Sequence, residues 1–261
     1  MPHYINTTTT VNTCIEHIKN NKRGLYLRYG DGDYNIVRWI PDMLCIPTNE
    51  FVSWMKISMS LRGDTIMTCI PHHCRLLNTL EDGICPGNHE YDGNNVMMYL
   101  QILNNYAPLP SNIYSNIALS YSSSRNPQLV VELHKVLKRR HIVFFGNMTY
   151  TDSFLKLLFG EKLDRINTNA RDSYLDHDTK MNEFDILYKN KLVSMDYFVI
   201  IMAAGCGGRA YSAELYRKYD SNFFIFDYGS LIDYLAGENT RAYMDIDPPQ
   251  REYILKELSK L

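Results

Sequence analysis

The sequence predicts an α/β protein with a mostly parallel β-sheet and helices on both faces. Short apolar runs of strand length recur along the chain, and most of them end in a turn that contains glycine. Stretches with helical periodicity follow these turns. Strands that alternate with helices in this way form parallel sheets, because each helix carries the chain back to the edge where the next strand begins.

Length, composition and charge bound the organisation and the partners of the chain. The 261 residues, 45% of them hydrophobic, suffice for one large α/β domain or for two small ones around a shared cleft. We expect a single domain over residues 1–261, with an N-terminal half of about 1–125 and a C-terminal half of about 126–261. The formal net charge of −2 shows no basic excess, so nucleic acid is not expected as a partner.

Targeting and redox features favour a cytoplasmic location. No apolar run approaches the roughly 20 residues of a membrane span, and the N-terminal residues lack the basic and apolar regions of a signal peptide. The six cysteines form no CxxC pair and have no zinc-finger spacing with histidine, which is typical of reduced thiols. We therefore expect a cytoplasmic protein without a membrane span.

The N-terminal half is expected to begin with a helix over residues 11–20, where apolar side chains recur at helical spacing. Basic residues and Gly24 end this helix, and the apolar run 24–29 is the first predicted strand. Further helices are expected at 34–40, 50–61 and 95–103, a strand at 64–70, and a strand or buried turn at 113–119. Residues 81–95, rich in Asp, Gly and Asn, are expected to form a loop or lid.

The C-terminal half follows a more regular pattern of strand, turn and helix. Asn126 and Pro127 mark the start of an amphipathic helix over 126–139, because proline is favoured at the first helical position. Strands are expected at 141–147, 163–168, 197–204 and 223–226. The run at 197–204 is the most apolar of them. Helices are expected at 151–159, 181–188, 209–219 and, on the surface, at 248–261.

Glycine-containing turns at the predicted strand ends are the main candidates for a ligand site. In a parallel sheet these turns share one edge, where backbone N–H groups can approach phosphates. A nucleotide diphosphate with a divalent cation fits such an edge, although close packing of helix on strand also explains such glycines. None of the turns is a Walker A loop or a GxGxxG fingerprint. The four glycine-containing turns are Gly30-Asp31-Gly32-Asp33, Gly146-Asn147, Gly205-Cys206-Gly207-Gly208 and Asp227-Tyr228-Gly229-Ser230.

Acidic and polar side chains near these turns could carry the chemistry. Asp31 and Asp33 can converge on one hard cation, Mg²⁺ or Mn²⁺, although Asp-Gly is also an ordinary turn dipeptide. The loop 167–174 could supply amide and carboxylate contacts to a sugar, or be a polar surface loop. His72 and His73, at the end of a predicted strand, could contact phosphate or simply be exposed.

Several of these motifs resemble one known family. Arg28-Tyr29-Gly30-Asp31-Gly32-Asp33 resembles the R-[FY]-G-D-G-E segment of the GT-D type glycosyltransferases. The segments 143–147, 169–170, 203–205 and 227–233 also resemble that family and its bacterial polysaccharide-locus relatives. The resemblance extends from about residue 25 to about residue 243, and its specificity lies in the order and number of the motifs.

The resemblance implies a Rossmann-like hexosyl- or pentosyltransferase. Such an enzyme moves a sugar from a nucleotide-diphosphate sugar, with UDP-sugars favoured, to a glycan or glycoprotein acceptor. The family's D-x-E motif binds Mn²⁺ (or Mg²⁺) and the donor diphosphate. Its aspartate corresponds to Asp31, whereas Asp33 stands in the place of the glutamate and reaches one methylene less far. Asp227 and Gly229 correspond to the family's Asp-x-Gly motif.

These implications complete the predicted site. Asp31 and Asp33 are the metal ligands, and both are counted as catalytic together with Asp172 and Asp233, the candidates for the base that takes the acceptor proton. Backbone amides near Gly205 and Gly207 would neutralise the diphosphate as it leaves. The predicted donor-binding residues are Arg28, Gly30, Gly32, Gly146, Asn147, Asn169, Gly205, Gly207, Asp227, Gly229 and Ser230.

Two other functions are considered beside the transferase. An S-adenosylmethionine-dependent methyltransferase also uses a Rossmann sheet, but its glycine loop normally follows the first strand of the domain. Here the glycine turn that precedes an acidic strand end begins at Gly205, close to the C-terminus. A non-catalytic module that binds nucleotide sugars or glycans is the third possibility, and a donor that binds without turnover would identify it.

Overall fold

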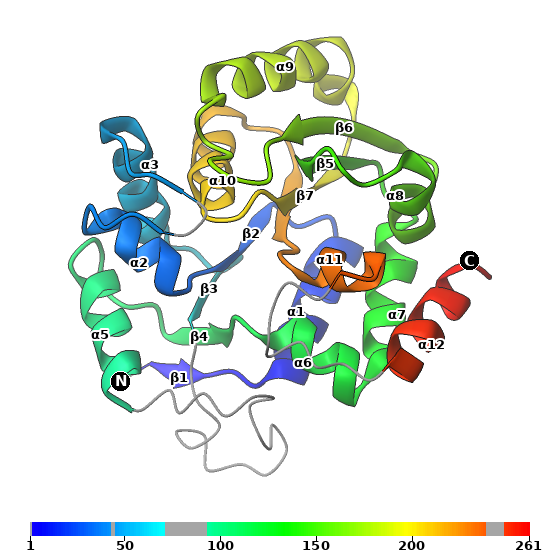
Figure 1. The fold of residues 1–261 in the computed structure, drawn as a ribbon, viewed down its shortest axis with the longest axis horizontal. Coiled ribbons are helices and arrows are strands. Elements are labelled where there is room, and N and C mark those ends of the chain that lie inside the picture. Colours follow the sequence, from blue (N-terminus) through cyan, green and yellow to red (C-terminus); the bar gives the residue numbers. More distant parts are fainter. Residues whose placement is uncertain (1, 43–44, 71–92, 239–247) are drawn as a thin grey trace.

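All strands that the structure describes belong to one parallel sheet (Figure 1). The structure is a computed structural model that describes residues 2–42, 45–70, 93–238 and 248–261. The order of its eight strands is β1-β4-β3-β2-β8-β7-β5-β6, and every recorded pairing is parallel. The predicted fold class is therefore confirmed. The strands are β1 (His3–Tyr4), β2 (Gly24–Arg28), β3 (Ile66–Ile70), β4 (Asn112–Ser115), β5 (Ile142–Asn147), β6 (Leu163–Thr168), β7 (Phe198–Ala203) and β8 (Phe223–Asp227).

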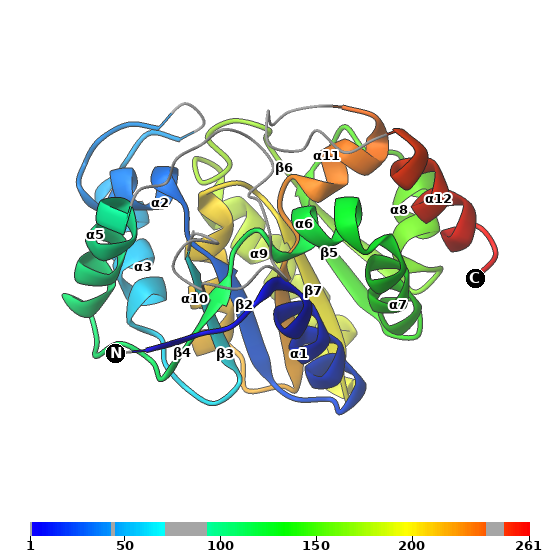
Figure 2. The same ribbon diagram turned by 90° about the horizontal axis from the view of Figure 1, so that it is seen from below.

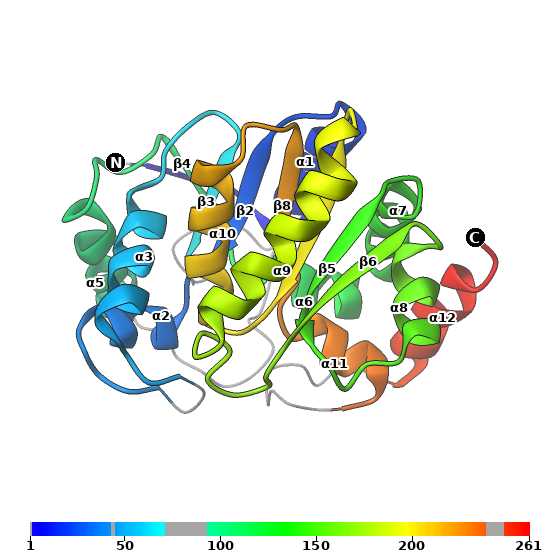
Figure 3. The ribbon, with the colours of Figure 1, turned by 90° about the horizontal axis from the view of Figure 1, so that it is seen from above.

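Helices cover both faces of this sheet, and each face has its own apolar core. Figure 2 shows α1 and α7 in front of the sheet, whereas Figure 3 shows α9 and α10 on the opposite side. The first face carries α2 (Asp31–Val37), α3 (Asn49–Ser60), α5 (Gly93–Asn104), α9 (His177–Asn190) and α10 (Gly207–Lys218). The second face carries α1 (Thr7–Lys19), α6 (Ala118–Arg125), α7 (Pro127–Leu137), α8 (Asp152–Phe159), α11 (Leu231–Ala236) and α12 (Pro248–Leu258).

The central strands explain why the sheet is covered on both sides. In β7, Ile200 and Met202 pack into the first core, while Val199 and Ile201 pack into the second. This alternation follows from the two-residue period of a strand, which points successive side chains to opposite faces. A strand that is apolar at every position can bury both faces only between two layers of helices.

The largest difference from the expected elements lies at the first glycine turn. The helix expected from residue 34 begins at Asp31, so both aspartates of the turn belong to its first turn. The Asp33 side chain accepts a hydrogen bond from the Gly30 N–H at 2.8 Å, which satisfies a backbone donor that the helix start leaves free. Carboxylates also stabilise this end of a helix through its dipole.

Other differences concern segments whose apolar run suits either a strand or a helix. The run 113–119, expected as a strand or buried turn, contains the end of β4 and the start of α6. Hydrophobic periodicity does not distinguish a strand from a helix in so short a segment. The short β1, α11 and the 3₁₀ turn Leu192–Ser194 were not expected. The candidate contacts His72 and His73 lie outside the described residues, and so does nearly all of the loop expected over 81–95.

The connections that follow β2 and β8 lead to opposite faces of the sheet. These two strands are neighbours, yet β2 leads into α2 on the first face and β8 leads into α11 on the second. In open α/β sheets, ligands bind at the carboxyl edge where neighbouring connections part in this way. Among the helices described, none is both long and apolar enough to cross a bilayer.

Candidate functional site

A buried ion pair joins the carboxyl ends of β2 and β8. The guanidinium of Arg28 lies 3.0 Å from Asp227 Oδ1, and the Arg28 backbone N–H donates to Asp227 Oδ2 at 3.3 Å. Burial opposes the charge on Arg28, but the adjacent carboxylate of Asp227 outweighs this effect, so the pKa of Arg28 is raised. Arg28 therefore keeps its charge, and its two contacts with Asp227 fix the two strand ends relative to each other.

Gly229 makes room for this pair. A Cβ atom at this position would lie 1.4 Å from Nη2 of Arg28, and the backbone has a φ of +59°, in the region that favours glycine. The Asp-x-Gly motif thus has a physical reason. Its aspartate holds the arginine, and its glycine leaves the space that the arginine occupies.

Arg209 links this pair to the turn after β7, and sequence reasoning did not find it. Its Nε–H donates to the Arg28 carbonyl at 2.7 Å, and one of its terminal nitrogens donates to the Gly205 carbonyl. The same Nε lies 3.2 Å from Asp33 Oδ1 and 3.5 Å from Asp227 Oδ2. Burial opposes the charge here as well, yet Asp227 and Asp33 raise the pKa of Arg209. The sequence does contain a signal for Arg209. It is an arginine that stands two residues after the start of α10, the helix that follows the glycine turn.

Asp33 is a buried carboxylate with one oxygen that accepts no hydrogen bond. It is 2% exposed, and only its Oδ2 accepts a hydrogen bond, from Gly30. Its Oδ1 receives no hydrogen bond from the part of the chain that the structure describes, because the nearby Arg209 N–H points to a carbonyl. Burial raises the pKa of Asp33 to about 6, although Arg209 counteracts part of the rise. Asp33 can therefore exchange a proton near neutral pH.

Asp31 has a different environment from Asp33. Its side chain is exposed and accepts a hydrogen bond from the hydroxyl of Tyr99, whose ring stacks on Tyr34 at 4.2 Å. Positions i and i+2 of a helix are turned by about 200° from each other. The two carboxylates consequently face different surroundings, one open and one buried.

This arrangement bears on the metal that the sequence led us to expect. Asp31 offers an open carboxylate of the kind that Mn²⁺ or Mg²⁺ prefers. Asp33 does not fit as a second ligand as arranged here, because Oδ2 is taken by Gly30 and Oδ1 faces the Arg209 cation. A shared metal at Asp31 and Asp33 stays a prediction that these contacts do not support.

The turn after β7 combines an open glycine with a packed one. A Cβ at Gly205 would meet nothing within 4 Å, so this backbone, at a φ of +53°, faces free space. A Cβ at Gly207 would lie 2.5 Å from the hydroxyl of Ser173, which donates to the Ala204 carbonyl. Packing explains Gly207, whereas Gly205 leaves its backbone accessible at the start of α10.

Packing or local turns also account for other predicted donor-binding residues. A Cβ at Gly146 would come within 2.7 Å of Phe144, and one at Gly32 within 2.8 Å of the Cys206 sulfur. Asn147 accepts from the Thr149 N–H at 3.1 Å within its own turn, and Asn169 donates to Asp176 at 2.8 Å. Ser230 precedes α11 without a side-chain hydrogen bond to that helix. Their roles toward a donor stay predictions from the sequence.

The two candidates for the catalytic base lie on opposite faces of the sheet. Asp172 accepts from the Ile46 N–H at 3.0 Å and borders a small hollow with Cys45 and Phe51 on the first face. Asp233 belongs to α11 on the second face and accepts a hydrogen bond from the hydroxyl of Tyr150. Arg28, Asp33, Arg209 and Asp227 are thus joined by hydrogen bonds and ion pairs with Gly229 beside them, whereas Asp172 and Asp233 bond to residues outside this cluster.

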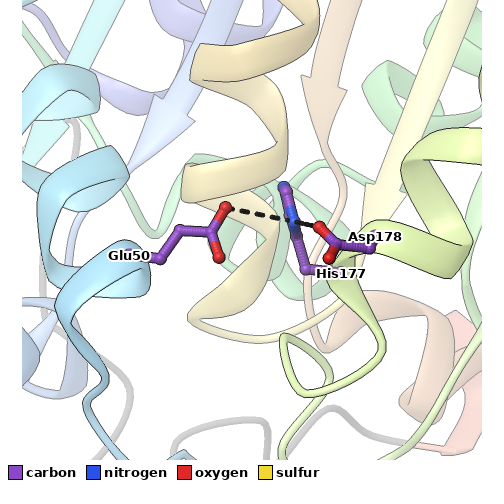
Figure 4. Close-up of side chains that lie close together, drawn as sticks. All are labelled: Glu50, His177 and Asp178. Carbon is purple, nitrogen blue, oxygen red and sulfur yellow. Dashed lines mark hydrogen bonds and ion pairs between the residues drawn. The ribbon is translucent and has the colours of Figure 1, made fainter.

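A second group of ligand-type side chains lies on the first face, on α3 and α9. Glu50, His177 and Asp178 each place one potential ligand atom within 4.8 Å of the others (Figure 4). Sequence reasoning missed this group because Glu50 is far from the other two along the chain. His177 and Asp178 begin α9, which had been expected to start only at residue 181.

Comparisons with known proteins agree with the fold. No protein-family model and no curated protein matches the sequence. A solved structure described as a new glycosyltransferase of the domain of unknown function 1792, from Streptococcus sanguinis, has a TM-score of 0.69 at 13% identity. The match covers 95% of this chain and 93% of that one.

A further structure of the same domain supports the same architecture. It is described as a highly conserved domain with a distinct glycosyltransferase fold, and it matches with a TM-score of 0.61 at 13% identity. That match covers 91% of this chain and 83% of the other. At this identity the likeness establishes a shared fold. The fold implied by the sequence resemblance is therefore confirmed.

Proposed function

We propose that this protein is a glycosyltransferase that moves a sugar from a nucleotide-diphosphate sugar to a glycan or glycoprotein acceptor. The observation that carries the proposal is the shared fold, over 95% of the chain, with a structure described as a glycosyltransferase. The polar cluster at the β2–β8 edge supports it, because that edge is where open α/β sheets bind their ligands.

The charges at this edge suit a diphosphate. Arg28 and Arg209 face two carboxylates, those of Asp33 and Asp227. When Asp33 takes a proton, one arginine charge is left without a counter-charge, and an anion can replace it. The open backbone at Gly205 and the N-terminus of α10 add N–H groups that favour phosphate.

The residues near the reacting sugar have separate tasks in this proposal. The two arginines and the backbone amides stabilise the nucleoside diphosphate as the bond to the sugar breaks. A carboxylate takes the proton of the acceptor hydroxyl, and the candidates are Asp31, which is exposed, and Asp172 and Asp233, which are half-buried. Asp33 keeps Arg209 and the Gly30 turn in place. No step is assigned to a metal ion, because Asp33 does not fit as its second ligand.

The donor class is part of the same proposal. The resemblance favours UDP-sugars and hexosyl or pentosyl transfer, and a cytoplasmic location remains expected from the sequence. Thermal-shift measurements with UDP-sugars, GDP-sugars and S-adenosylmethionine, each with and without Mn²⁺, test these alternatives. Stabilisation by a nucleotide sugar supports the proposal, whereas stabilisation by S-adenosylmethionine alone identifies a methyltransferase instead.

A turnover assay on the donor that binds best completes the test. Release of the nucleoside diphosphate in the presence of acceptor glycans is expected for the native protein. Asp31→Asn should lower the rate at least tenfold. Asp220→Asn, an exposed carboxylate just before β8 at the opposite edge of the sheet, should not change it. A donor that binds but never turns over identifies a non-catalytic module.

The pH dependence of donor binding tests the role of the charge cluster. Because the pKa of Asp33 is raised to about 6, affinity for a UDP-sugar should increase as the pH falls through that value. Asp33→Asn removes the titrating charge, so the variant should bind at pH 8 as the native protein binds at pH 5. Isothermal titration at both pH values measures this, and equal pH slopes in the two proteins would contradict it.

A further inference from the structure

His177 lies among carboxylates from three helices. It is the first residue of α9, and its ring nitrogen Nδ1 lies 3.0 Å from Asp178 Oδ1 and 3.4 Å from Glu50 Oε1 on α3. Figure 4 shows Glu50 and Asp178 reaching the imidazole from two different helices. The arrangement concentrates negative charge around one nitrogen atom.

Glu214 fixes the orientation of this imidazole from α10. The Nε2 atom of His177 lies 2.5 Å from Glu214 Oε2, and both side chains are largely buried. With its hydrogen on Nε2, a neutral His177 directs the lone pair of Nδ1 toward the other two carboxylates. A carboxylate behind a histidine in this way is the usual support of a metal-binding imidazole.

Tyr174 is an independent sign of a missing ligand. It is 6% exposed, and its ring stacks on that of His177 at 4.6 Å. Its hydroxyl has no hydrogen-bond partner within residues 2–42, 45–70, 93–238 and 248–261. Burial raises the pKa of Tyr174, and the charges of Glu50 and Glu214 raise it further. A buried hydroxyl without a partner is unfavourable, so a group that completes the site would satisfy it.

We propose that Glu50, His177 and Asp178 bind a divalent transition-metal ion, with Zn²⁺ as the best match. Two ligands bound at about 2.0–2.1 Å in a tetrahedral site lie roughly 3.3 Å apart, close to the separations of Nδ1 from the two carboxylates. An imidazole beside two carboxylates suits Zn²⁺ better than Mg²⁺ or Ca²⁺, which prefer oxygen ligands alone.

The exposure of the ligands is compatible with entry of an ion. The side chains of Glu50 and Asp178 are 55% and 96% exposed, so both can adjust while His177 stays fixed by Glu214. Three protein ligands leave a fourth position for water. The hydroxyl of Tyr174 can hydrogen-bond that water, which gives it the partner that it lacks.

The bound ion would link α3 to α9 directly, and it would link them to α10 through the hydrogen bond between His177 and Glu214. Glu214 lies five residues, roughly 7.5 Å along the helix axis, from Arg209 of the edge cluster. The site shares no residue with the Arg28–Asp227 edge, so the proposal does not depend on the transferase assignment. The role of the bound ion is to hold in place the loop in which Ser173 packs against Gly207.

Zinc titration of chelator-treated protein tests the site. Isothermal titration should detect a Zn²⁺ site whose affinity falls at least tenfold in Glu50→Gln and in Asp178→Asn. Glu183→Gln, a carboxylate on α9 that pairs with Lys180 instead, is the matched control and should not change the affinity. Mg²⁺ at the same concentration should not compete. The difference between native protein and variants is the readout, because cysteines elsewhere can also bind Zn²⁺.

Histidine resonances identify the nitrogen atom that binds. In ¹⁵N-edited spectra, Zn²⁺ should shift Nδ1 of His177 while Nε2 keeps its hydrogen, and Zn²⁺ should raise the melting temperature of the native protein only. The two exposed variants avoid the risk that a buried His177 variant fails to fold. Unchanged Zn²⁺ affinity in both of them, or an unshifted Nδ1, would overturn the proposal.

Discussion

The charged cluster at the β2–β8 edge and the charged cluster at the start of α9 differ in their balance of charge. At the β2–β8 edge, two arginines face two carboxylates deep in the structure. At the start of α9, one imidazole faces three carboxylates, two of them exposed. A buried and balanced cluster tends to accept an anion when one carboxylate is protonated, whereas a partly exposed cluster rich in carboxylates tends to accept a cation. The same residue types thus favour opposite ligands.

Substitution of Gly229 should have the largest effect. In Gly229→Ala the new Cβ occupies the place of the Arg28 guanidinium and also requires a φ of +59°. The buried pair with Asp227 then breaks, and we expect a loss of about 4 kcal/mol or more in the free energy of unfolding. Urea denaturation measures it. Gly205→Ala is the control, since it shares the positive φ but meets no atoms, and should lose only about 1 kcal/mol.

Removal of Arg209 tests whether the edge cluster depends on charge balance. Arg209→Met leaves Asp33 and Asp227 with one buried cation fewer, so stability should fall by about 3 kcal/mol. The double variant with Asp33→Asn should recover part of that loss, because the unpaired charge is then gone. Arg217→Met, an exposed position on the same helix, should have little effect. Strict additivity of the two changes would contradict the coupling.

The pH dependence of stability separates Asp33 from the other carboxylates. Its pKa is raised from 3.8 to about 6, so the folded protein binds its proton more tightly than the unfolded chain does. The contribution of Asp33 to the free energy of unfolding is therefore greatest below pH 3.8. It decreases by about 3 kcal/mol as the pH rises from 3.8 to about 6. Relative to native protein, Asp33→Asn should gain stability across that interval. Urea midpoints at several pH values measure it, and a constant difference would refute the assignment.

The His177 cluster should give the smallest effect and a different pH window. Burial lowers the pKa of His177, but its carboxylates outweigh burial and raise it above 6.5. The stability that the imidazolium contributes is present below 6.5 and is lost as the pH rises through the raised value. Glu214→Gln should lower this pKa and cost about 1 kcal/mol at pH 6. NMR titration of the imidazole measures the pKa, with Glu183→Gln as the unchanged control.

The sequence predicted much of the fold and part of the candidate site. Strands 141–147 and 163–168 were expected almost as they occur in β5 and β6, because local hydrophobic periodicity encodes them. Arg28, Asp33, Asp227 and Gly229 were expected near one another, since parallel strand ends share an edge. Arg209 was missed because only its position beside the Arg28 carbonyl reveals its role.

By itself, the sequence determined where strands, turns and helices alternate and which residues stand at the strand ends. Only the tertiary structure decided that β2 lies beside β8, that Asp33 turns inward while Asp31 stays exposed, and that Glu50 meets His177. Arg28 is 199 residues from Asp227 and 181 from Arg209. No local pattern encodes such contacts, because they follow from the packing of whole elements against each other.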